Sequence, residues 1–236
     1  MIRCFSATGN SRIVADLLGD EIARCSDKVV WVFPIHAWGV PRHVLRLMAT
    51  AGDIPDDATH WMVATCGDDI GNADLQWRQA MEERGWIAAG AWSVLMPDTY
   101  ICLPGFTVDG AEERAEKLAA LPGRVAMIRR AILEGCTVTD VRRGAVPSFK
   151  SGFLRRFFEK HLMSPSKFRV GERCTHCGTC AGVCPQSNIR FGEDGHPMFG
   201  DECMMCLACL HACPHTAIEW GRFTKGKQRY KRIEKI

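Results

Sequence analysis

The segment CTHCGTCAGVCP at residues 174–185 recurs with the same spacing as CMMCLACLHACP at residues 203–214. Each copy places three cysteines at intervals of three residues, a fourth cysteine four residues further on, and a proline directly after it. The similarity continues past the cysteines, since Ile189 and Phe191 follow the first copy as Ile218 and Trp220 follow the second. This repeat predicts a duplicated unit with a pseudo-twofold axis.

The cysteine spacing is typical of iron–sulfur ligation. Three thiolates on a tight loop can bind three corners of one iron–sulfur cube, while the fourth cysteine reaches the neighbouring cube. We therefore assign one 4Fe-4S cluster to Cys174, Cys177, Cys180 and Cys213, and a second to Cys203, Cys206, Cys209 and Cys184. Structural zinc is the alternative, but zinc gives no reason for a third cysteine at this spacing or for the proline. From Arg173 to Phe223 the chain resembles bacterial two-cluster ferredoxins.

Composition argues against several other classes of protein. The thirteen cysteines are an odd number and eight of them lie between Cys174 and Cys213, which does not fit a secreted disulfide scaffold. A net charge of +3 over 236 residues gives no whole-molecule case for binding nucleic acid or an anionic membrane. No apolar run is long enough to span a bilayer, and the first residues lack the features of a signal peptide, so we expect a cytoplasmic protein.

The first part of the chain alternates short apolar runs with amphipathic stretches, which predicts an α/β fold: a parallel sheet with helices on both faces. We expect strands at 2–5, 29–33, 61–65 and 86–96, and helices that begin near residues 10, 41, 72 and 111. The pair Pro122-Gly123 predicts a kink in the last helix or its division into two.

Three parts follow from these patterns. Residues 1–145 form the α/β domain, residues 146–168 a connecting helix, and residues 169–236 a small α+β ferredoxin domain with a basic tail. One stripe of the connecting helix carries Phe149, Phe153, Phe157 and Leu162, and we expect it to pack the domains together, with a docking surface as the alternative. The tail carries Arg222, Lys225, Lys227, Arg229, Lys231, Arg232 and Lys235 against only Glu234. We expect the tail to be solvated; steering toward an acidic partner and packing over the first domain are the alternatives.

A glycine loop, Ser6-Ala7-Thr8-Gly9-Asn10-Ser11, lies between the first strand and the first helix. Its hydroxyl groups, backbone N–H groups and the following helix N-terminus suit an anion such as a phosphate monoester. The loop holds no lysine or arginine and lacks the ending of a nucleotide triphosphate loop. A simple helix cap is the alternative interpretation.

Two more loops follow predicted strands, PIHAWGVP at residues 34–41 and TCGDD at residues 65–69. All three loops would leave the carboxyl ends of parallel strands, where open α/β sheets bind ligands. Over residues 1–105 the chain resembles flavodoxins, and its domain order resembles flavodoxin–ferredoxin fusion proteins of anaerobic bacteria.

This resemblance implies bound FMN. The glycine loop would hold the phosphate, Trp38 would stack on the ring, Gly67 and Asp68 would border its other edge, and Tyr100 is a candidate for the opposite face. In flavodoxins a glycine carbonyl of the tryptophan loop turns toward N5 of the ring, and Gly39 occupies that place. The candidate residues are Ser6, Ala7, Thr8, Gly9, Asn10 and Ser11, then His36, Ala37, Trp38 and Gly39, then Thr65, Cys66, Gly67 and Asp68, and Tyr100.

The sequence departs from flavodoxins in one respect. Only about a dozen residues separate Ala23 from Pro34, so one strand–helix unit is missing, and we expect a trimmed sheet of about four strands. Cys66 could be a reactive thiol in the third loop or a small buried side chain, and the residues alone favour the second interpretation. His36 could tune the flavin or lie in solvent.

These features predict an electron-transfer protein that couples FMN to its clusters, within the chain or across a homodimer, and serves redox partner proteins. The first alternative is a flavin-dependent reductase of a small molecule, fed by the clusters. The second is a cluster protein whose first domain is empty and serves for docking. No residue is assigned a catalytic role, and the absence of a G-x-G-x-x-G fingerprint argues against NAD(P)H as the direct donor.

Overall fold

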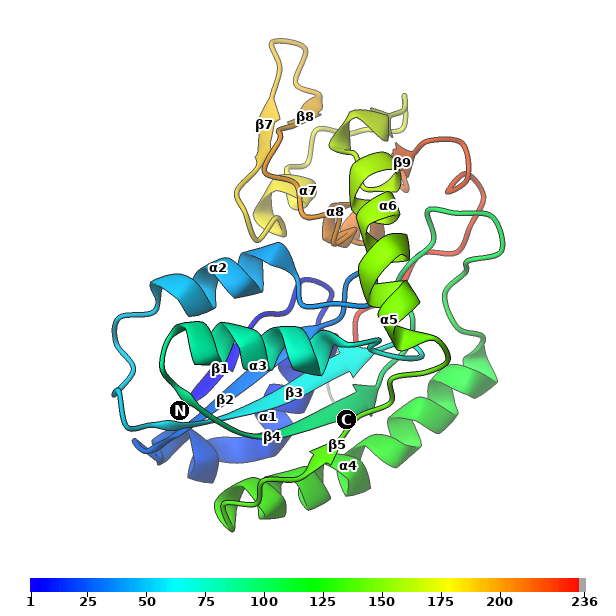
Figure 1. The fold of residues 1–236 in the computed structure, drawn as a ribbon. Helices are drawn as coiled ribbons and strands as arrows, with labels where there is room; N and C mark the ends of the chain where they lie inside the picture. Colours follow the sequence, from blue (N-terminus) through cyan, green and yellow to red (C-terminus); the bar gives the residue numbers. More distant parts are fainter. Residues whose placement is uncertain (234–236) are drawn as a thin grey trace.

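The computed structural model describes residues 1–233 and contains a layered α/β domain beneath a small cysteine-rich domain (Figure 1). The α/β domain contains β1 (Ile2–Cys4), α1 (Asn10–Arg24), β2 (Lys28–Pro34), α2 (Arg42–Thr50), β3 (Thr59–Cys66), α3 (Ala73–Glu83), β4 (Ile87–Leu95), α4 (Ala111–Leu133) and β5 (Thr139–Asp140). The strands form one parallel sheet in the order β1-β2-β3-β4-β5. The predicted parallel α/β fold is confirmed.

The alternating direction of successive apolar side chains along the strands explains why helices cover both faces of the sheet. Val30 and Val32 of β2 face α1 and α4, whereas Trp31 and Phe33 of the same strand face α2 and α3. Successive residues of a strand point to opposite faces, so a continuous apolar run needs cover on both sides. Figure 1 shows α2 and α3 above the sheet, and α1 and α4 below it.

The connections between strands have two different hands. All of them step in the same direction across the sheet, but α1 and α4 cross on one face and α2 and α3 on the other. Two parallel connections that step the same way on opposite faces must differ in hand, although right-handed connections strongly predominate in proteins. As a result, the loops after β1 and β2 diverge to opposite faces, and so do the loops after β3 and β4.

Two expectations about the α/β domain need correction. The sheet has five strands and not about four, because Thr139 and Asp140 pair with Ala91 and Trp92. That strand is two exposed residues long and therefore leaves no apolar alternation in the sequence. The last helix is not divided into two at Pro122: α4 runs from Ala111 to Leu133, and its buried positions before and after the proline pack on the same face of the sheet.

The connecting segment is a helical run of alternating α and π turns, α5 (Pro147–Phe149), η1 (Lys150–Leu154), α6 (Arg155–Phe157) and η2 (Phe158–Leu162). The expected packing stripe is wrong: Phe149, Phe153 and Phe157 are 54%, 66% and 45% exposed. Wider π turns change which residues share a face. Ser151, Arg155 and Phe158 contact the α/β domain in their place.

The cysteine-rich domain contains η3 (Pro165–Lys167), β6 (Phe168–Val170), α7 (Thr179–Gly182), β7 (Ile189–Phe191), β8 (Pro197–Phe199), α8 (Ala208–Ala212) and β9 (Ile218–Trp220). β6 pairs with β9 and β7 with β8, both antiparallel. Its core also includes Ile101 and Cys102, which come from the loop after β4 and are fully buried. This loop therefore joins the two domains through a shared core.

The basic tail packs along the α/β domain, which was the alternative to a solvated tail, although Arg222, Lys225, Lys231 and Arg232 are exposed. Tyr230 and Ile233 are buried against α1 and α4. Nζ of Lys227 donates hydrogen bonds to the carbonyls of Ile101, Leu103 and Phe106. Glu234 and Lys235 lie outside the described residues. Among the helices of residues 1–233, none combines the length and apolar character needed to cross a membrane.

Candidate redox centre

The eight repeat cysteines line two small cavities, four in each. Cys174, Cys177, Cys180 and Cys213 line one, and Cys184, Cys203, Cys206 and Cys209 line the other. In each set, three cysteines come from one copy of the repeat and the fourth from the other copy, which is the grouping expected from the spacing. None of the chain's thirteen cysteines, all within the described part, forms a disulfide.

The backbone of the cysteine loops repeats as the sequence does. The left-handed conformation occurs at three pairs of equivalent positions: His176 and Met205, Gly178 and Leu207, and Ser187 and Thr216. Left-handed turns at non-glycine residues are uncommon and are held only where the surroundings require them. The first two pairs turn the chain between successive cysteines, so that the first three cysteines of each loop line one cavity, and the third pair follows the fourth cysteine of each copy.

Hydrogen bonds to sulfur follow the same symmetry. The backbone N–H of Asn188 donates to Sγ of Cys184 at 3.4 Å, and the equivalent N–H of Ala217 donates to Sγ of Cys213 at 3.3 Å. N–H···S bonds are among the features that set the potentials of iron–sulfur clusters. Both bonds involve the fourth cysteine of a copy, which lines the cavity of the other copy.

The two cavities differ in their access to solvent. The first includes Cys177, which is exposed. The second is lined by Met204, which also packs against the core of the α/β domain, and burial raises the pKa of Cys206 to about 12. One set of cysteines is therefore near the surface, and the other is near the junction of the domains.

Comparison with known proteins supports this interpretation. Residues 166–214 match the family model of the 4Fe-4S dicluster domain. This segment is a ferredoxin-like domain. The match contains all eight repeat cysteines and supports an iron–sulfur cluster with a role in electron transfer. No curated protein matches the chain.

A larger cavity of about 370 Å³ lies at the carboxyl ends of the sheet strands, within the range of cofactor pockets. It opens where loops of neighbouring strands diverge to opposite faces, a position at which open α/β sheets bind ligands. The first four strands all contribute, through Thr8 after β1, Trp38 after β2, Cys66 at the end of β3 and Tyr100 after β4. Cys206 and Leu207 complete the wall, and both also line the second cysteine cavity.

Ten of the fifteen residues expected at the flavin site line this cavity. They are Thr8, Asn10, His36, Ala37, Trp38, Thr65, Cys66, Gly67, Asp68 and Tyr100. Ser6, Ala7, Gly9, Ser11 and Gly39 do not. Sequence reasoning missed Phe106, Lys150, Phe158 and Met205, which lie far along the chain from the three loops.

The tryptophan loop is a tight turn closed by two hydrogen bonds between His36 and Gly39. Ala37 and Trp38 occupy its centre, both with positive φ. Ser151 donates to the Trp38 carbonyl at 2.6 Å, and the Trp38 ring meets Phe158 edge-on. Desolvation, assisted by the Arg155 charge, lowers the pKa of His36 to about 4, so this histidine is neutral near pH 7.

Gly39 is required by close packing. An added Cβ would overlap the guanidinium of Arg155, which donates to the Val40 carbonyl at 2.7 Å and to Gln76 Oε1 at 3.0 Å. The Gly39 carbonyl already accepts a hydrogen bond from His36 N–H. Gly39 does not line the cavity in this conformation.

The side chains of the glycine loop hold the loop to its neighbours. Ser6 Oγ accepts from the N–H of Arg12, Ser11 Oγ and Thr65 Oγ1 lie 2.8 Å apart, and Asn10 Nδ2 donates to the Pro97 carbonyl. These contacts fix the start of α1 at the cavity, with Thr8 and Asn10 in its wall. They leave the serines fewer free lone pairs for a ligand than expected.

The Tyr100 hydroxyl is buried in the cavity region and has no hydrogen-bond partner among the described residues. Burial raises the pKa of Tyr100, so the hydroxyl stays protonated. Burial also raises the pKa of Cys66 to about 12, which keeps that thiol unreactive. A cavity with Trp38, Tyr100, Phe106 and Phe158 in its wall and one unpaired buried hydroxyl fits a planar aromatic cofactor.

Proposed function

We propose that this protein is an electron carrier that couples FMN in the central cavity to two 4Fe-4S clusters and exchanges electrons with redox partner proteins. One observation carries the proposal: the cavity lined by Trp38 and Tyr100 is also lined by Cys206. A flavin there would lie beside a cluster ligand of the same chain. Transfer within the chain then needs no homodimer.

In this proposal FMN exchanges one or two electrons, whereas each cluster exchanges one. Together, FMN and the clusters would connect two-electron redox couples to one-electron redox couples. The chain's own residues orient the cofactors and exclude water. Trp38, Phe158, Tyr100 and Phe106 would enclose the ring, and Thr8 and Asn10 would face the phosphate end. The two sets of four cysteines would hold the clusters.

The geometry supports an order of carriers. The set that contains Cys206 shares its wall with the central cavity, whereas the set that contains exposed Cys177 does not. We infer the order FMN, then the Cys206 cluster, then the Cys177 cluster, then the partner protein. In this order the most exposed cluster meets the partner.

The side chains that enclose the cavity favour an electron carrier over a reductase of a small molecule. Phe158 and Lys150 of the connecting segment, Phe106 of the loop after β4, and Met163 all line it. A volume of about 370 Å³ is near the lower end for one cofactor-sized ligand, which leaves little room for a substrate beside the flavin.

Cofactor analysis of the anaerobically purified full chain tests the proposal. We expect about eight iron atoms and one acid-extractable FMN per chain, before or after reconstitution. A matched pair on the connecting segment tests the cavity: Phe158→Ala should lower FMN retention, and Phe153→Ala, which is on the exposed face, should not. A cluster-loaded protein that takes up no FMN would contradict the flavin part and favour a docking role for the first domain. Zinc in place of iron would contradict the whole proposal.

A further inference from the structure

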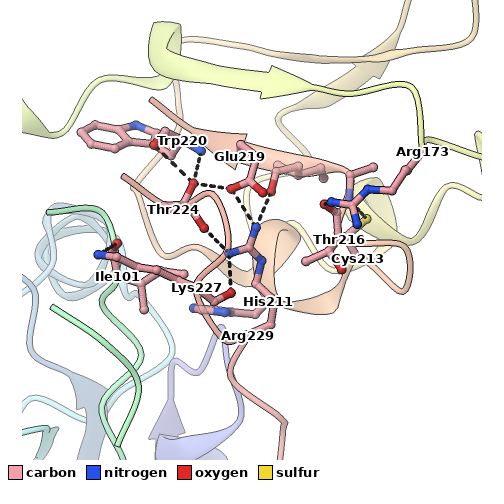
Figure 2. Close-up of polar contacts among 12 residues, drawn as sticks. Ile101, Arg173, His211, Cys213, Thr216, Glu219, Trp220, Thr224, Lys227 and Arg229 are labelled. Carbon is pink, nitrogen blue, oxygen red and sulfur yellow. Dashed lines mark hydrogen bonds and ion pairs between the residues drawn. The ribbon is translucent and has the colours of Figure 1, made fainter. Parts of the chain in front are cut away.

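Where the tail leaves the cysteine-rich domain, its residues form a cluster of hydrogen bonds and one ion pair around Arg229 (Figure 2). Arg229 pairs with Glu219 at 2.8 Å and donates to the carbonyls of Thr224 and Lys227. Thr224 Oγ1 in turn accepts from the N–H of Trp220 and donates to Glu219. This cluster fixes the chain so that the residues after 229 run from β9 toward the α/β domain.

Two buried residues then fix the tail on the start of α1. Tyr230 is 5% exposed, and its hydroxyl donates to Oδ1 of Asn10 at 2.5 Å. Ile233 is buried in the core with α1 and α4, and Arg114 donates to the Lys231 carbonyl at 2.9 Å. The residues between these anchors therefore have a defined position.

Arg232 lies between the anchors and crosses the glycine loop. A Cβ added at Gly9 would lie 2.9 Å from Cγ and 3.0 Å from Nε of Arg232. Gly9 also has a φ of 105°, so both its backbone conformation and its space exclude a side chain. The Arg232 side chain is exposed and makes no ion pair with any residue of the described range.

We propose that Arg232 supplies the cation of a phosphate site on the glycine loop, beside the end of the cavity that Thr8 and Asn10 line, and that the tail thereby favours FMN over riboflavin. This inference rests on the proposed function. The glycine loop contains no cationic residue of its own, and its serines are partly engaged in holding the loop. A guanidinium placed across such a loop can form charge-assisted hydrogen bonds to phosphate oxygens. Riboflavin has no phosphate and would gain nothing from this group.

Flavin titration of the cluster-loaded full chain, stripped of flavin, tests the inference. FMN and riboflavin are added separately, and quenching of flavin fluorescence gives each Kd. Arg232→Gln should weaken FMN binding by about tenfold at low ionic strength and leave riboflavin binding unchanged. The loss should shrink as salt is added, because the guanidinium is exposed. Arg232→Lys should retain part of the preference.

Lys231→Gln is the matched control, since it removes the same charge from the adjacent exposed position. Equal FMN affinities in the Arg232→Gln and Lys231→Gln variants would overturn the inference, as would equal losses for FMN and riboflavin. The proposed function would survive either result. Wild-type protein that binds neither flavin would overturn the proposed function and this inference with it.

Discussion

The hydroxyl of Tyr100 is an unusual group in the candidate redox centre. It is buried, stays protonated and has no partner among the described residues. A buried donor without a partner costs about 1–3 kcal/mol, so such groups persist mainly where they have a role. The backbone on either side is held, because Asp98 Oδ1 accepts from the N–H groups of Thr99 and Tyr100. The hydroxyl is therefore positioned before any ligand arrives.

Tyr100→Phe should change stability and flavin affinity in opposite senses. Removal of the unpaired hydroxyl should stabilise the flavin-free protein by about 1 kcal/mol, while FMN binding should weaken by about fivefold through loss of a donor. Urea unfolding of the flavin-free chain and fluorescence titration with FMN measure the two effects. A variant that is less stable without flavin, or that binds FMN as well as wild type, would contradict a ligand role for this hydroxyl.

His60 should make stability depend on pH. It is fully buried, its Nδ1 accepts from Trp31 Nε1 at 2.9 Å, and desolvation lowers its pKa to about 4 from about 6.5. The folded state thus binds fewer protons than the unfolded state between these values. The stabilisation is complete above pH 6.5 and is lost progressively as pH falls toward 4.

From pH 7.5 to 5.5, wild type should lose about 1.5 kcal/mol more stability than His60→Gln, which keeps an acceptor for Trp31 but cannot titrate. Anaerobic urea unfolding followed by tryptophan fluorescence gives the difference, and the other histidines cancel in the comparison. Identical pH profiles for the two proteins would show that His60 does not contribute.

At the residue scale, the sequence predicted positions whose chemistry depends on local spacing. The cysteine grouping followed from two runs of four, and Trp38 and Thr65 from loops directly after strands. The contacts of Arg155 with Gly39 and of Arg232 with Gly9 were not predicted, since each arginine is brought to its loop by tertiary packing over a long stretch of chain. No local pattern marks such a residue.

Among the elements, short and irregular ones were the hardest to predict. β5 has two exposed residues, and the connecting segment changes helical pitch three times, which places its phenylalanines at the surface. The long buried strands were clear, because their apolar runs need cover on both faces. Helix α4 shows the opposite effect: Pro122 predicted a kink or a division into two helices, and packing of Leu121, Val125 and Ile128 on the sheet keeps one continuous helix.

Helix α4 therefore carries a local cost that a substitution can remove. Gly123 is exposed, and an added Cβ meets no atom within 4 Å. Gly123→Ala should stabilise the protein by about 1 kcal/mol and raise its Tm by about 2–4 °C. Ala119→Gly, at an exposed position of the same helix, should lower Tm by a similar amount. Scanning calorimetry measures both changes in Tm. An unchanged Tm for Gly123→Ala would contradict the prediction and would indicate that Pro122 strains the helix at this position, so that the higher helix propensity of alanine has no effect.

At the scale of the whole molecule, the two hands of the strand connections explain the position of the cavity. With every connection on one face, the loops after the strands would turn the same way and leave no crevice between them. The ferredoxin-like domain then closes this crevice, because Ile101 and Cys102 anchor the loop after β4 in its core. The shared core also brings Cys206 into the cavity wall.

In the proposed function this arrangement would make the two clusters unequal, and paired cysteine variants can test that. Cys206→Ala removes a ligand beside the central cavity, whereas Cys177→Ala removes one from the exposed set. With FMN bound, Cys177→Ala should keep fast transfer between photoreduced flavin and the remaining cluster, but lose at least about tenfold in the rate of reducing an external one-electron acceptor protein, since the exit carrier is missing.

Cys206→Ala should lose the internal step itself, because the remaining cluster has no shared wall with the flavin cavity. Stopped-flow absorbance follows the flavin, low-temperature EPR after rapid freezing follows the reduced cluster, and iron analysis confirms that each variant keeps one cluster. If Cys206→Ala transferred electrons internally as fast as Cys177→Ala, the order of carriers would be wrong, even with FMN and both clusters present in the wild-type chain.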